Sequence, residues 1–466
     1  MKKTNLLLNS WADDVKKAVN DLIDLYGGLE NAYAVFDFDN TSSIFDVGEQ
    51  LAIYQLDNMC FGFTPNEIEA VLSSGLGDMD RDLSHFGYGK GSYRDWITDI
   101  KTAYTYLYRQ YGPFCAKEVE DEKLATLHSD EMWLEFAAKM RAMYDLIGDN
   151  ESTDVSYPWI LYWYTGLTAD EVYELAMKSH RLYRDYPSEA VALTSPSGVK
   201  SLAGVVTADF TKGITVTDNT RELWHALKEN GIDVWVCSAS QLDVIRAAVD
   251  YFGLHDDITG ITAMTIQEKN GVFCPKYDYE TGYPVLAVEN SGWIKTEHPN
   301  GAQTQGKGKV ATIENTLFPR YGVGPIAGFM DSTGDFNFCT EFSSLKLVVC
   351  FNRLRKSTDG GGLIAEVAMY QKDELGYTLA SANQAGDTLY VLQGRDENDP
   401  RCLRNGNATV ALNQYSEKLF ADERNQEQLR HMTDAKMTTA DALNTLSRKE
   451  TNSCGFLKEY DGYHSH

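Results

Sequence analysis

Residues 33–41 read Tyr-Ala-Val-Phe-Asp-Phe-Asp-Asn-Thr, a short apolar run that leads directly into two carboxylates. The run predicts a strand buried in a sheet, and the alternation of side chains along a strand sends Asp37 and Asp39 to the same side. Two like charges held close together are costly unless a cation compensates them. A divalent metal ion is such a cation, and it would leave one carboxylate to attack phosphorus and the other to pass a proton. The alternative interpretation of these residues alone is a plain acidic turn after a strand.

Three further stretches downstream place polar or charged side chains where a strand ends or a helix begins. Residues 234–237 read as a buried strand, and Ser238 follows with a hydroxyl that can donate to a phosphoryl oxygen. Residues 306–310, Gly-Lys-Gly-Lys-Val, open a helical pattern whose lysine can neutralise a nucleophile and the charge of a transferred group. A third apolar run ends in the acidic pair Asp331 and Asp335, whose hard oxygen ligands suit magnesium.

Two lysines compete for the role of the cation. Either Lys307 or Lys309 can serve by its position in the chain. Lys309 is preferred, because Val310, Ile313 and Leu317 continue it into an apolar helix face.

In this order, the four motifs resemble those of the haloacid dehalogenase superfamily of aspartate-nucleophile phosphatases. The resemblance covers about residues 30–56 and 205–355, and it departs from the superfamily pattern where Met330 stands in place of a glycine. It implies a magnesium-dependent phosphomonoester hydrolase with an aspartyl-phosphate intermediate, built on a doubly wound parallel α/β core with an inserted helical cap. Carried over position by position, the resemblance implies Asp37 as nucleophile and metal ligand, and Asp39 as general acid and base with its main-chain carbonyl on the metal. Thr41 and Ser238 would donate hydrogen bonds to the phosphate, and Lys309 would be the catalytic residue that clamps its charge. Asp331 would be a Mg²⁺ ligand, and Asp335 would either bind the metal or orient its ligand water.

A closer likeness concerns the substrate. Residues 40–51 and 162–173 look like segments of bacterial phosphorylcholine phosphatases and their relatives. That likeness implies a substrate with a quaternary ammonium head, held by aromatic faces and a carboxylate. Each cation–π contact of this kind is worth about 0.5 to 2 kcal/mol once it is desolvated. Phe45, Asp46 and Glu49 are the candidates for this head-group site, because they lie within a turn or two of the first motif.

Phosphocholine or a similar small amino-alcohol phosphate is therefore the first-choice substrate. The alternative within the class is a phosphoserine-like or sugar phosphate, which would need arginines or hydrogen-bonding groups of the cap in place of an aromatic cage. Phosphoryl transfer to an acceptor other than water is a third possibility, and a catalytically silent protein that binds phosphate esters is a fourth. Against the silent protein, every residue type that the chemistry needs is present.

The spacing of the motifs predicts the domain organisation. The long interval between Thr41 and Ser238 exceeds what a strand–helix–strand unit requires, so it must hold an insertion. This interval has helical periodicity and a dense content of aromatic residues, most of which we expect in the interior of a cap. The predicted domains are a catalytic core of residues 1–56 and 201–355, the helical cap of residues 57–200, and a C-terminal extension of residues 356–466 packed on the core.

Local signals predict two further elements. An amphipathic pattern over residues 11–26, followed by Gly27 and Gly28, predicts a helix. Asn270-Gly271 between apolar segments predicts a β-hairpin, within a turn-rich region of residues 260–300 that we expect to form a small second lid.

Charge and composition exclude some partners. The 466 residues carry a formal net charge of −26, which argues against unaided binding to nucleic acid or to an anionic membrane. No apolar run reaches the length of a membrane span, and the histidines show no metal-ligand spacing. The eight cysteines contain no C-x-x-C pair, which is typical of reduced thiols. Because the apolar run at residues 6–8 is too short for a signal peptide, we expect a cytoplasmic protein, or an exported one if a leader was removed.

Overall fold

The chain is described by a computed structural model, which forms two compact units. The described residues are 3–114, 118–184, 187–277, 283–298, 303–356, 359–419 and 423–450. The first unit comprises Met1–Asp46, Ile214–Met264 and Tyr279–His466, and the second comprises Val47–Gly213 and Thr265–Asp278. Each unit has its own architecture.

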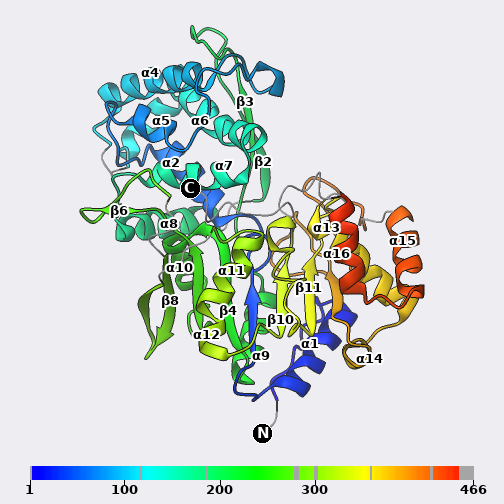
Figure 1. The fold of residues 1–466 in the computed structure, drawn as a ribbon. Coiled ribbons are helices and arrows are strands. Elements are labelled where there is room, and N and C mark those ends of the chain that lie inside the picture. The colour runs from blue at the N-terminus through cyan, green and yellow to red at the C-terminus, as the bar shows by residue number, and fades with distance from the viewer. Residues whose placement is uncertain are drawn as a thin grey trace. The chain divides into compact units, whose positions relative to one another are not determined.

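An eight-stranded sheet forms the centre of the first unit, with helices on both of its faces (Figure 1). The strand order is β12-β11-β10-β1-β4-β5-β8-β9. Neighbouring strands from β12 to β5 are parallel, whereas β8 and β9 pair antiparallel at one edge. The strands are β1 (Tyr33–Phe36), β4 (Asp233–Gln241), β5 (Gly260–Met264), β8 (Tyr283–Glu289), β9 (Gly292–His298), β10 (Ala327–Met330), β11 (Leu347–Phe351) and β12 (Leu389–Gln393). The predicted doubly wound α/β core is confirmed.

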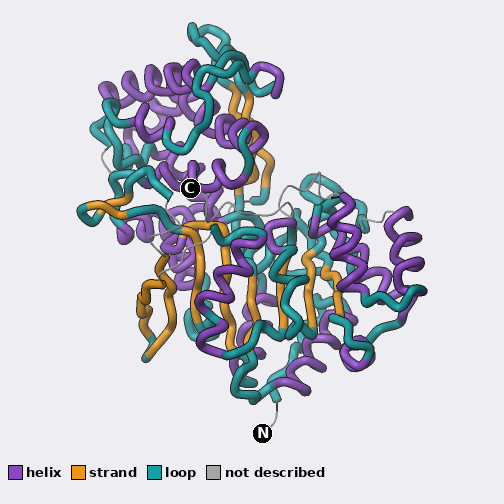
Figure 2. Tube along the Cα trace, in the orientation of Figure 1, coloured by secondary structure: helices purple, strands orange, loops and turns teal. Residues whose placement is uncertain are grey.

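Between β10 and β11 the chain has only the 3₁₀ helix Thr333–Asp335, whereas the other parallel neighbours are separated in the chain by helices of the first unit (Figure 2). The α-helices of this unit are α1 (Asp13–Tyr26), α9 (Asp218–Glu229), α10 (Leu242–Tyr251), α11 (Lys307–Thr316), α12 (Phe318–Tyr321), α13 (Gly360–Tyr370), α14 (Leu379–Gln384), α15 (Glu423–Asp434) and α16 (Thr439–Glu450). The helix predicted from the N-terminal amphipathic pattern is confirmed as α1, which buries Val15, Val19 and Leu22 and ends at Gly27.

Strand β1 lies in the middle of the sheet, between β10 and β4. All four of its residues are buried, which explains why the sequence shows an unbroken apolar run there instead of an alternating pattern. The ladder continues one residue past the strand, because the amide of Asp37 donates to the carbonyl of Phe329 over 3.0 Å. This bond fixes the backbone of Asp37 at the carboxyl edge of the sheet.

The C-terminal residues complete the first unit. Strand β12 pairs parallel with β11, so part of the predicted extension is a strand of the central sheet. Leu363 of α13, Tyr390 and Leu392 of β12 and Leu443 of α16 belong to the same apolar core as the central strands. Strands β8 and β9 come from the region expected to form a second lid, but β8 pairs with β5 and β9 pairs with β8, which places both strands in the sheet instead.

The second unit is mainly helical. Its α-helices are α2 (Val47–Asn58), α3 (Ile68–Ser73), α4 (Tyr93–Tyr111), α5 (Asp121–His128), α6 (Glu131–Asn150), α7 (Thr153–Leu161) and α8 (Ala169–Tyr183). Many of its aromatic side chains form the interior, as expected: the rings of Phe61, Tyr104 and Phe136 contact one another, and Trp163 packs against Phe61.

Two small hairpins complete the second unit. Strand β2 (Glu189–Thr194) pairs with β3 (Thr207–Lys212), and β6 (Glu268–Lys269) pairs with β7 (Val272–Phe273). The second hairpin confirms the turn predicted at Asn270-Gly271, where both residues have positive φ angles. The first hairpin carries the second unit on to Gly213, beyond the predicted boundary at residue 200, because antiparallel pairing ties both strands together.

Among the described residues, no helix combines the length and the apolar composition that crossing a membrane demands. Six described cysteines, Cys60, Cys237, Cys274, Cys339, Cys350 and Cys402, carry free thiols, and Cys115 and Cys454 lie outside the described residues.

Candidate active site

The candidate site lies at the carboxyl ends of three neighbouring strands of the first unit. Asp37 follows β1, Ser238 lies near the end of β4, and Asp331 follows β10. Because β1 lies between β4 and β10, parallel pairing brings the three side chains to one edge of the sheet. The site is therefore built by the order of the strands, not by nearness in sequence.

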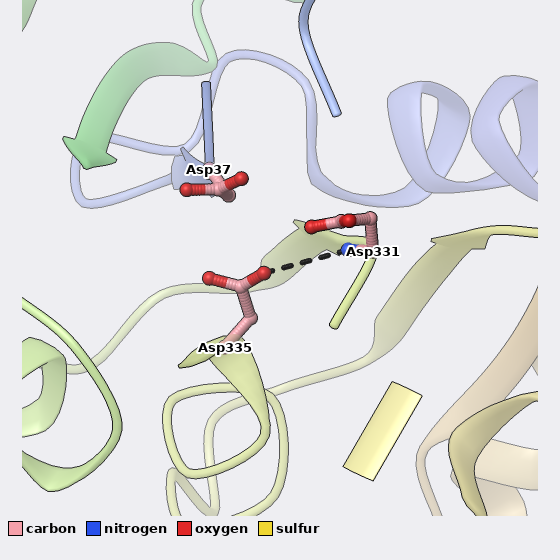
Figure 3. A group of neighbouring side chains, drawn as sticks. All are labelled: Asp37, Asp331 and Asp335. Atoms are coloured by element: carbon pink, nitrogen blue, oxygen red, sulfur yellow. Dashed lines mark hydrogen bonds between the residues drawn. The ribbon is translucent and has the colours of Figure 1, made fainter. Parts of the chain in front are cut away.

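Three carboxylates converge there (Figure 3). One carboxylate oxygen from each of Asp37, Asp331 and Asp335 lies within 4.8 Å of the others, and all three residues are buried. Asp335 also accepts a hydrogen bond from the amide of Asp331 over 3.4 Å, which links the two ends of that loop. Buried oxygen ligands of this number and charge fit a hard divalent cation such as Mg²⁺.

Lys309 provides a positive charge inside the cluster. Its Nζ donates to Oδ1 of Asp37 over 2.7 Å and to Oδ1 of Asp335 over 2.5 Å, and its exposed fraction is 1%. The ammonium also lies 5.7 Å from the centre of the Phe338 ring. Lys307 is only half-buried. Of the two candidate lysines, Lys309 is the one that contacts the carboxylates.

Burial and mutual repulsion set the proton affinities of these groups. Burial raises the pKa of Asp37, which Lys309 opposes and Asp331 reinforces. The pKa of Asp335 lies well above its ordinary value, because burial and the charge of Asp37 outweigh the attraction of Lys309. Burial acts to lower the pKa of Lys309, but Asp335 and Asp37 outweigh it and raise this pKa. The cluster therefore keeps its lysine charged and has an excess of acidic groups that a metal ion would neutralise.

Two glycines place Lys309. Gly306 precedes α11 with φ 54° and ψ −129°, a conformation open mainly to glycine, and its amide donates to the carbonyl of Gly334 over 2.7 Å. A Cβ atom at Gly308 would lie 1.7 Å from the carbonyl oxygen of Gln303. The Gly-Lys-Gly-Lys pattern thus lets the first turn of α11 pack against the preceding turn, with Lys309 directed at Asp37.

Two hydroxyls of the predicted site lie beside the carboxylates. Thr41 Oγ1 donates to Oδ2 of Asp37 over 3.1 Å and lies 3.5 Å from Oδ1 of Asp331. Ser238 Oγ lies 3.5 Å from Oδ2 of Asp39, and Ser240 Oγ donates to the same oxygen over 2.6 Å. The carboxylate of Asp39 is thus held by serines, and it is not one of the three that converge. A role for its main-chain carbonyl as a metal ligand stays a prediction.

Ser240 was not predicted from the sequence. The signal for it is its place two residues after Ser238, where the pairing of β4 with β5 shifts register between Ser238 and Gln241. An irregularity of this kind re-aims side chains at the end of a strand. Met330, the departure from the superfamily pattern, is fully buried and pairs with Cys350 of β11, so it serves as a core residue.

The three head-group candidates divide between the units. Phe45 and Asp46 belong to the first unit and Glu49 to the second. Phe45 has φ 69°, and its carbonyl accepts from the amide of Asn40 over 3.1 Å, which closes the loop after the first motif. Within the second unit, Glu49 accepts from Arg141 Nη2 over 2.7 Å. A role for these three residues in binding substrate stays a prediction.

Two arginines at the site were also not predicted. Arg353 follows β11, and its Nη1 donates to Oδ2 of Asp331 over 3.0 Å. Arg395 follows β12, and its Nη1 donates to the carbonyl of Asn40 over 3.0 Å. Both come after apolar runs that end at the carboxyl edge of the sheet, so the rule that pointed to Ser238 and Asp331 was also the available signal for them.

Comparison with known proteins gives limited matches. No protein-family model matches the chain. Phosphorylcholine phosphatase of Pseudomonas aeruginosa is 25% identical to the chain over 271 residues, which make up 57% of this chain and 58% of that protein. The chain thus matches less than two thirds of the length of this relative.

The chain also resembles a solved structure over most of its length. The crystal structure of a conserved protein of unknown function from Anaerococcus prevotii is 25% identical and has a TM-score of 0.69, covering 89% of this chain and 100% of that one. Cytosolic 5'-nucleotidase IIIB bound to cytidine is 14% identical with a TM-score of 0.29, covering 73% of this chain and 80% of that one, and this weak match carries no argument. Taken with the ordered motifs and the fold, the similarity to the phosphatase of Pseudomonas aeruginosa supports a haloacid dehalogenase-like protein and shows no precise family.

Proposed function

We propose that the protein is a Mg²⁺-dependent phosphomonoester hydrolase in which Asp37 is the nucleophile. The observation that carries the proposal is the convergence of Asp37, Asp331, Asp335 and Lys309 in one buried cluster at the carboxyl edge of the sheet. A structural ion pair would need one carboxylate for one ammonium. Three buried carboxylates face only Lys309 and Arg353 in these contacts, and the negative charge that remains is costly without a metal ion.

In this proposal each side chain has a chemical task. Asp37 attacks phosphorus while the ester oxygen leaves, and Asp39 protonates the leaving alcohol. The resulting phosphoryl group on Asp37 is then hydrolysed by a water molecule that Asp39 deprotonates. Lys309 favours the ionised form of Asp37 and stabilises the charge that spreads over the phosphoryl oxygens, and Thr41 and Ser238 donate to those oxygens.

Mg²⁺ bound by Asp37, Asp331 and Asp335 would supply further stabilisation of phosphoryl charge. The pKa of Asp37 is raised in the metal-free protein, so the metal would also favour its ionised, nucleophilic form.

Phosphocholine or a similar small amino-alcohol phosphate is the substrate that we propose. The likeness to the phosphorylcholine phosphatase of Pseudomonas aeruginosa supports this choice. Phe45, Asp46 and Glu49 are the proposed head-group residues, because an aromatic face and carboxylates attract a quaternary ammonium. Glu49 already has an arginine partner, so its contribution to a cation would be shared with Arg141.

Phosphate release from a panel of phosphomonoesters, with Mg²⁺ and with a chelator, tests the function. We expect turnover that requires Mg²⁺ and is greatest with phosphocholine. Metal-dependent turnover of phosphoserine-like or sugar phosphates alone would support the proposed chemistry and contradict the proposed substrate. Absence of turnover on every ester would contradict the proposed enzymatic activity and favour a catalytically silent protein that binds phosphate esters.

The head-group residues are tested with Glu49→Gln. Loss of its negative charge should raise KM for phosphocholine while KM for an ester without a cationic group stays unchanged. Equal effects on the two esters would show that Glu49 acts through the structure of its own unit. Glu69→Gln is the matched control, because Glu69 is an exposed glutamate of the same unit that also pairs with a basic side chain.

A further inference from the structure

Arg395 joins the C-terminal part of the first unit to the loop that carries the nucleophile. Its guanidinium is fully buried, and it donates from Nη1 to the carbonyl of Asn40 over 3.0 Å. Its Nη2 lies 3.4 Å from the side-chain oxygen of Asn40 and donates to Oε1 of Glu397 over 2.6 Å. Arg395 and Asn40 are 355 positions apart in the chain, so this contact is a property of the fold.

The backbone conformation of Asn40 sets the positions of its neighbours Asp39 and Thr41. It stands between Asp39 and Thr41 and has φ 62°, in the left-handed region that few residues other than glycine adopt readily. Its amide is tied to the carbonyl of Phe45, and its own carbonyl is held by Arg395. Holding this carbonyl fixes the plane of the peptide bond to Thr41, whose amide donates on the other side to Phe38.

Arg395 is itself held rigidly. Its amide donates to Oγ1 of Thr409 over 3.1 Å, and its carbonyl accepts from the amide of Val410 over 2.9 Å. Glu397, which neutralises it, accepts from the amide of Leu412 over 3.1 Å. The guanidinium is therefore a fixed point against which the loop of residues 37–46 can be placed.

Burying the charge of Arg395 is electrostatically costly, so added stability alone does not explain this contact. Burial lowers the pKa of Arg395 to about 10, and the charge of Arg353 acts in the same direction against the attraction of Glu397. A buried ion pair often adds little net stability compared with apolar residues of the same volume. The forked geometry of the guanidinium, by contrast, gives directional contacts that an apolar side chain cannot make.

We propose that Arg395 is a positioning residue for the nucleophile loop, acting through Asn40 on the placement of Asp39 and Thr41. The proposal rests on the proposed function for its catalytic consequence, but the anchoring of the loop does not depend on it. Arg395 touches none of the reacting groups. Its loss should therefore lower kcat, which depends on the aim of Asp39 and Thr41, more than it changes KM.

The test compares Arg395→Met and Arg395→Lys with the wild type in two measurements on the full chain. Hydrogen–deuterium exchange should be faster in the peptide that contains residues 37–46 of Arg395→Met, and intermediate in Arg395→Lys, because an ammonium cannot make both contacts of the fork. In phosphate release with Mg²⁺, kcat of Arg395→Met should fall on the order of 10- to 100-fold, as expected for misplaced catalytic groups, with KM changed less than about threefold. Arg401→Met is the matched control, because Arg401 is an exposed arginine of the same segment that pairs with Asp399.

The two measurements keep the outcomes apart. Unchanged exchange of residues 37–46 in both variants overturns the anchoring, and faster exchange with unchanged kcat overturns the positioning role. If Arg395→Met fails to fold, Arg395→Lys decides both points. A wild type without activity on any ester contradicts the proposed function, and the exchange result alone then decides whether Arg395 anchors the loop.

Discussion

Lys309 shows how one side chain sets the electrostatics of the site. It is held between two carboxylates in a place where an unpaired charge of either sign would be costly. Its pairing with Asp37 and Asp335 still leaves Asp331, which Arg353 contacts. The three converging carboxylates thus face two cations in these contacts, and this imbalance is what a divalent metal would correct.

Replacing Lys309 with methionine removes the ammonium and keeps a chain of similar length. Two buried carboxylates then lose their partner, and we expect the free energy of unfolding to fall by about 3 to 5 kcal/mol, with turnover reduced on the order of 10³-fold or more. Urea unfolding and phosphate release measure the two effects. Lys307→Met is the matched control, because Lys307 lies two residues away and is half-buried. The opposite pattern, an inactive Lys307 variant and an active Lys309 variant, would reverse the assignment.

The pair of Arg395 and Glu397 predicts a pH dependence of stability. Burial acts to raise the pKa of Glu397, but Arg395 outweighs it and lowers this pKa below the ordinary value of 4.5. A carboxyl whose pKa is lower in the folded state stabilises the fold above its unfolded pKa, and this contribution is lost as the pH falls through the folded pKa. Glu397→Gln should therefore be less stable than the wild type at neutral pH, and the difference should shrink below about pH 4.5. A difference that stays constant from neutral pH into that range would contradict the assignment, and urea unfolding at several pH values measures it.

Single site residues could be predicted from the sequence where they end a recognisable motif. Asp37, Ser238 and Asp331 could be located because each stands at the end of an apolar strand and in a known order. Arg353 and Arg395 also follow strands, but no local pattern tells an arginine that contacts the site from one that faces solvent. Arg395 contacts Asn40, 355 positions earlier, and Arg353 contacts Asp331, 22 positions earlier and at the end of the neighbouring strand, so the order of the strands in the sheet is needed to reveal both contacts.

At the scale of elements, the start of α11 carries the most restrictive packing. Gly308→Ala would bring a Cβ atom to 1.7 Å from the carbonyl of Gln303, a backbone atom that cannot move aside without shifting the turn. We expect a loss of about 1 to 3 kcal/mol in stability, and a fall in kcat because Lys309 moves with the helix.

Gly148→Ala is the control for this variant. Gly148 lies within helix α6, and a Cβ atom there would meet its nearest neighbour, Ser156 Oγ, only at 3.5 Å. Alanine should leave activity unchanged and stabilise that helix by up to about 1 kcal/mol. Thermal unfolding and phosphate release on both variants give the comparison. Wild-type kcat in Gly308→Ala would contradict the account of α11.

The elements of the sheet differ in how far the sequence predicts them. The buried parallel strands stand out as apolar runs, and β1, β4 and β10 could be located from them. The edge strands β8 and β9 could not be assigned to the sheet, because edge strands that turn antiparallel look like a lid hairpin in sequence. The glycine run at residues 360–362 had no explanation in the sequence. In the structure it starts α13 so close to the fourth motif that a Cβ at Gly361 would lie 2.4 Å from the carbonyl oxygen of Asp331.

At the scale of the whole molecule, the acidic cluster couples metal binding to stability. A ligand that binds only the folded state stabilises it, and Mg²⁺ at a concentration a hundredfold above its Kd would add about 2.7 kcal/mol. We therefore expect Mg²⁺ to raise Tm at neutral pH, and a chelator to reverse the change. Asp331→Asn should lose most of this shift, and Asp256→Asn, at an exposed aspartate of the first unit, should keep it. An equal shift in all three proteins would show that the ion acts elsewhere.

The division of the chain was harder to predict from sequence than its motifs. The long interval between the first two motifs predicted an inserted domain, and its helical periodicity predicted that this domain is helical. The boundaries of the inserted domain depend on contacts between residues that are far apart in the sequence. Strand β3 belongs to the second unit because it pairs with β2, and residues Thr265–Asp278 belong there although they follow β5 of the first unit. Strand β12 belongs to the first unit's sheet although it follows the last motif.

The central claim is that Asp37 carries the phosphoryl group during turnover. Borohydride reduces an aspartyl-phosphate to homoserine, so the protein should be quenched with borohydride during turnover of its best phosphomonoester, digested, and sequenced by tandem mass spectrometry. We predict homoserine at position 37, absent when substrate or Mg²⁺ is omitted, and Asp37→Asn without turnover. A reduced adduct at another residue, or undiminished turnover by Asp37→Asn, would contradict the account.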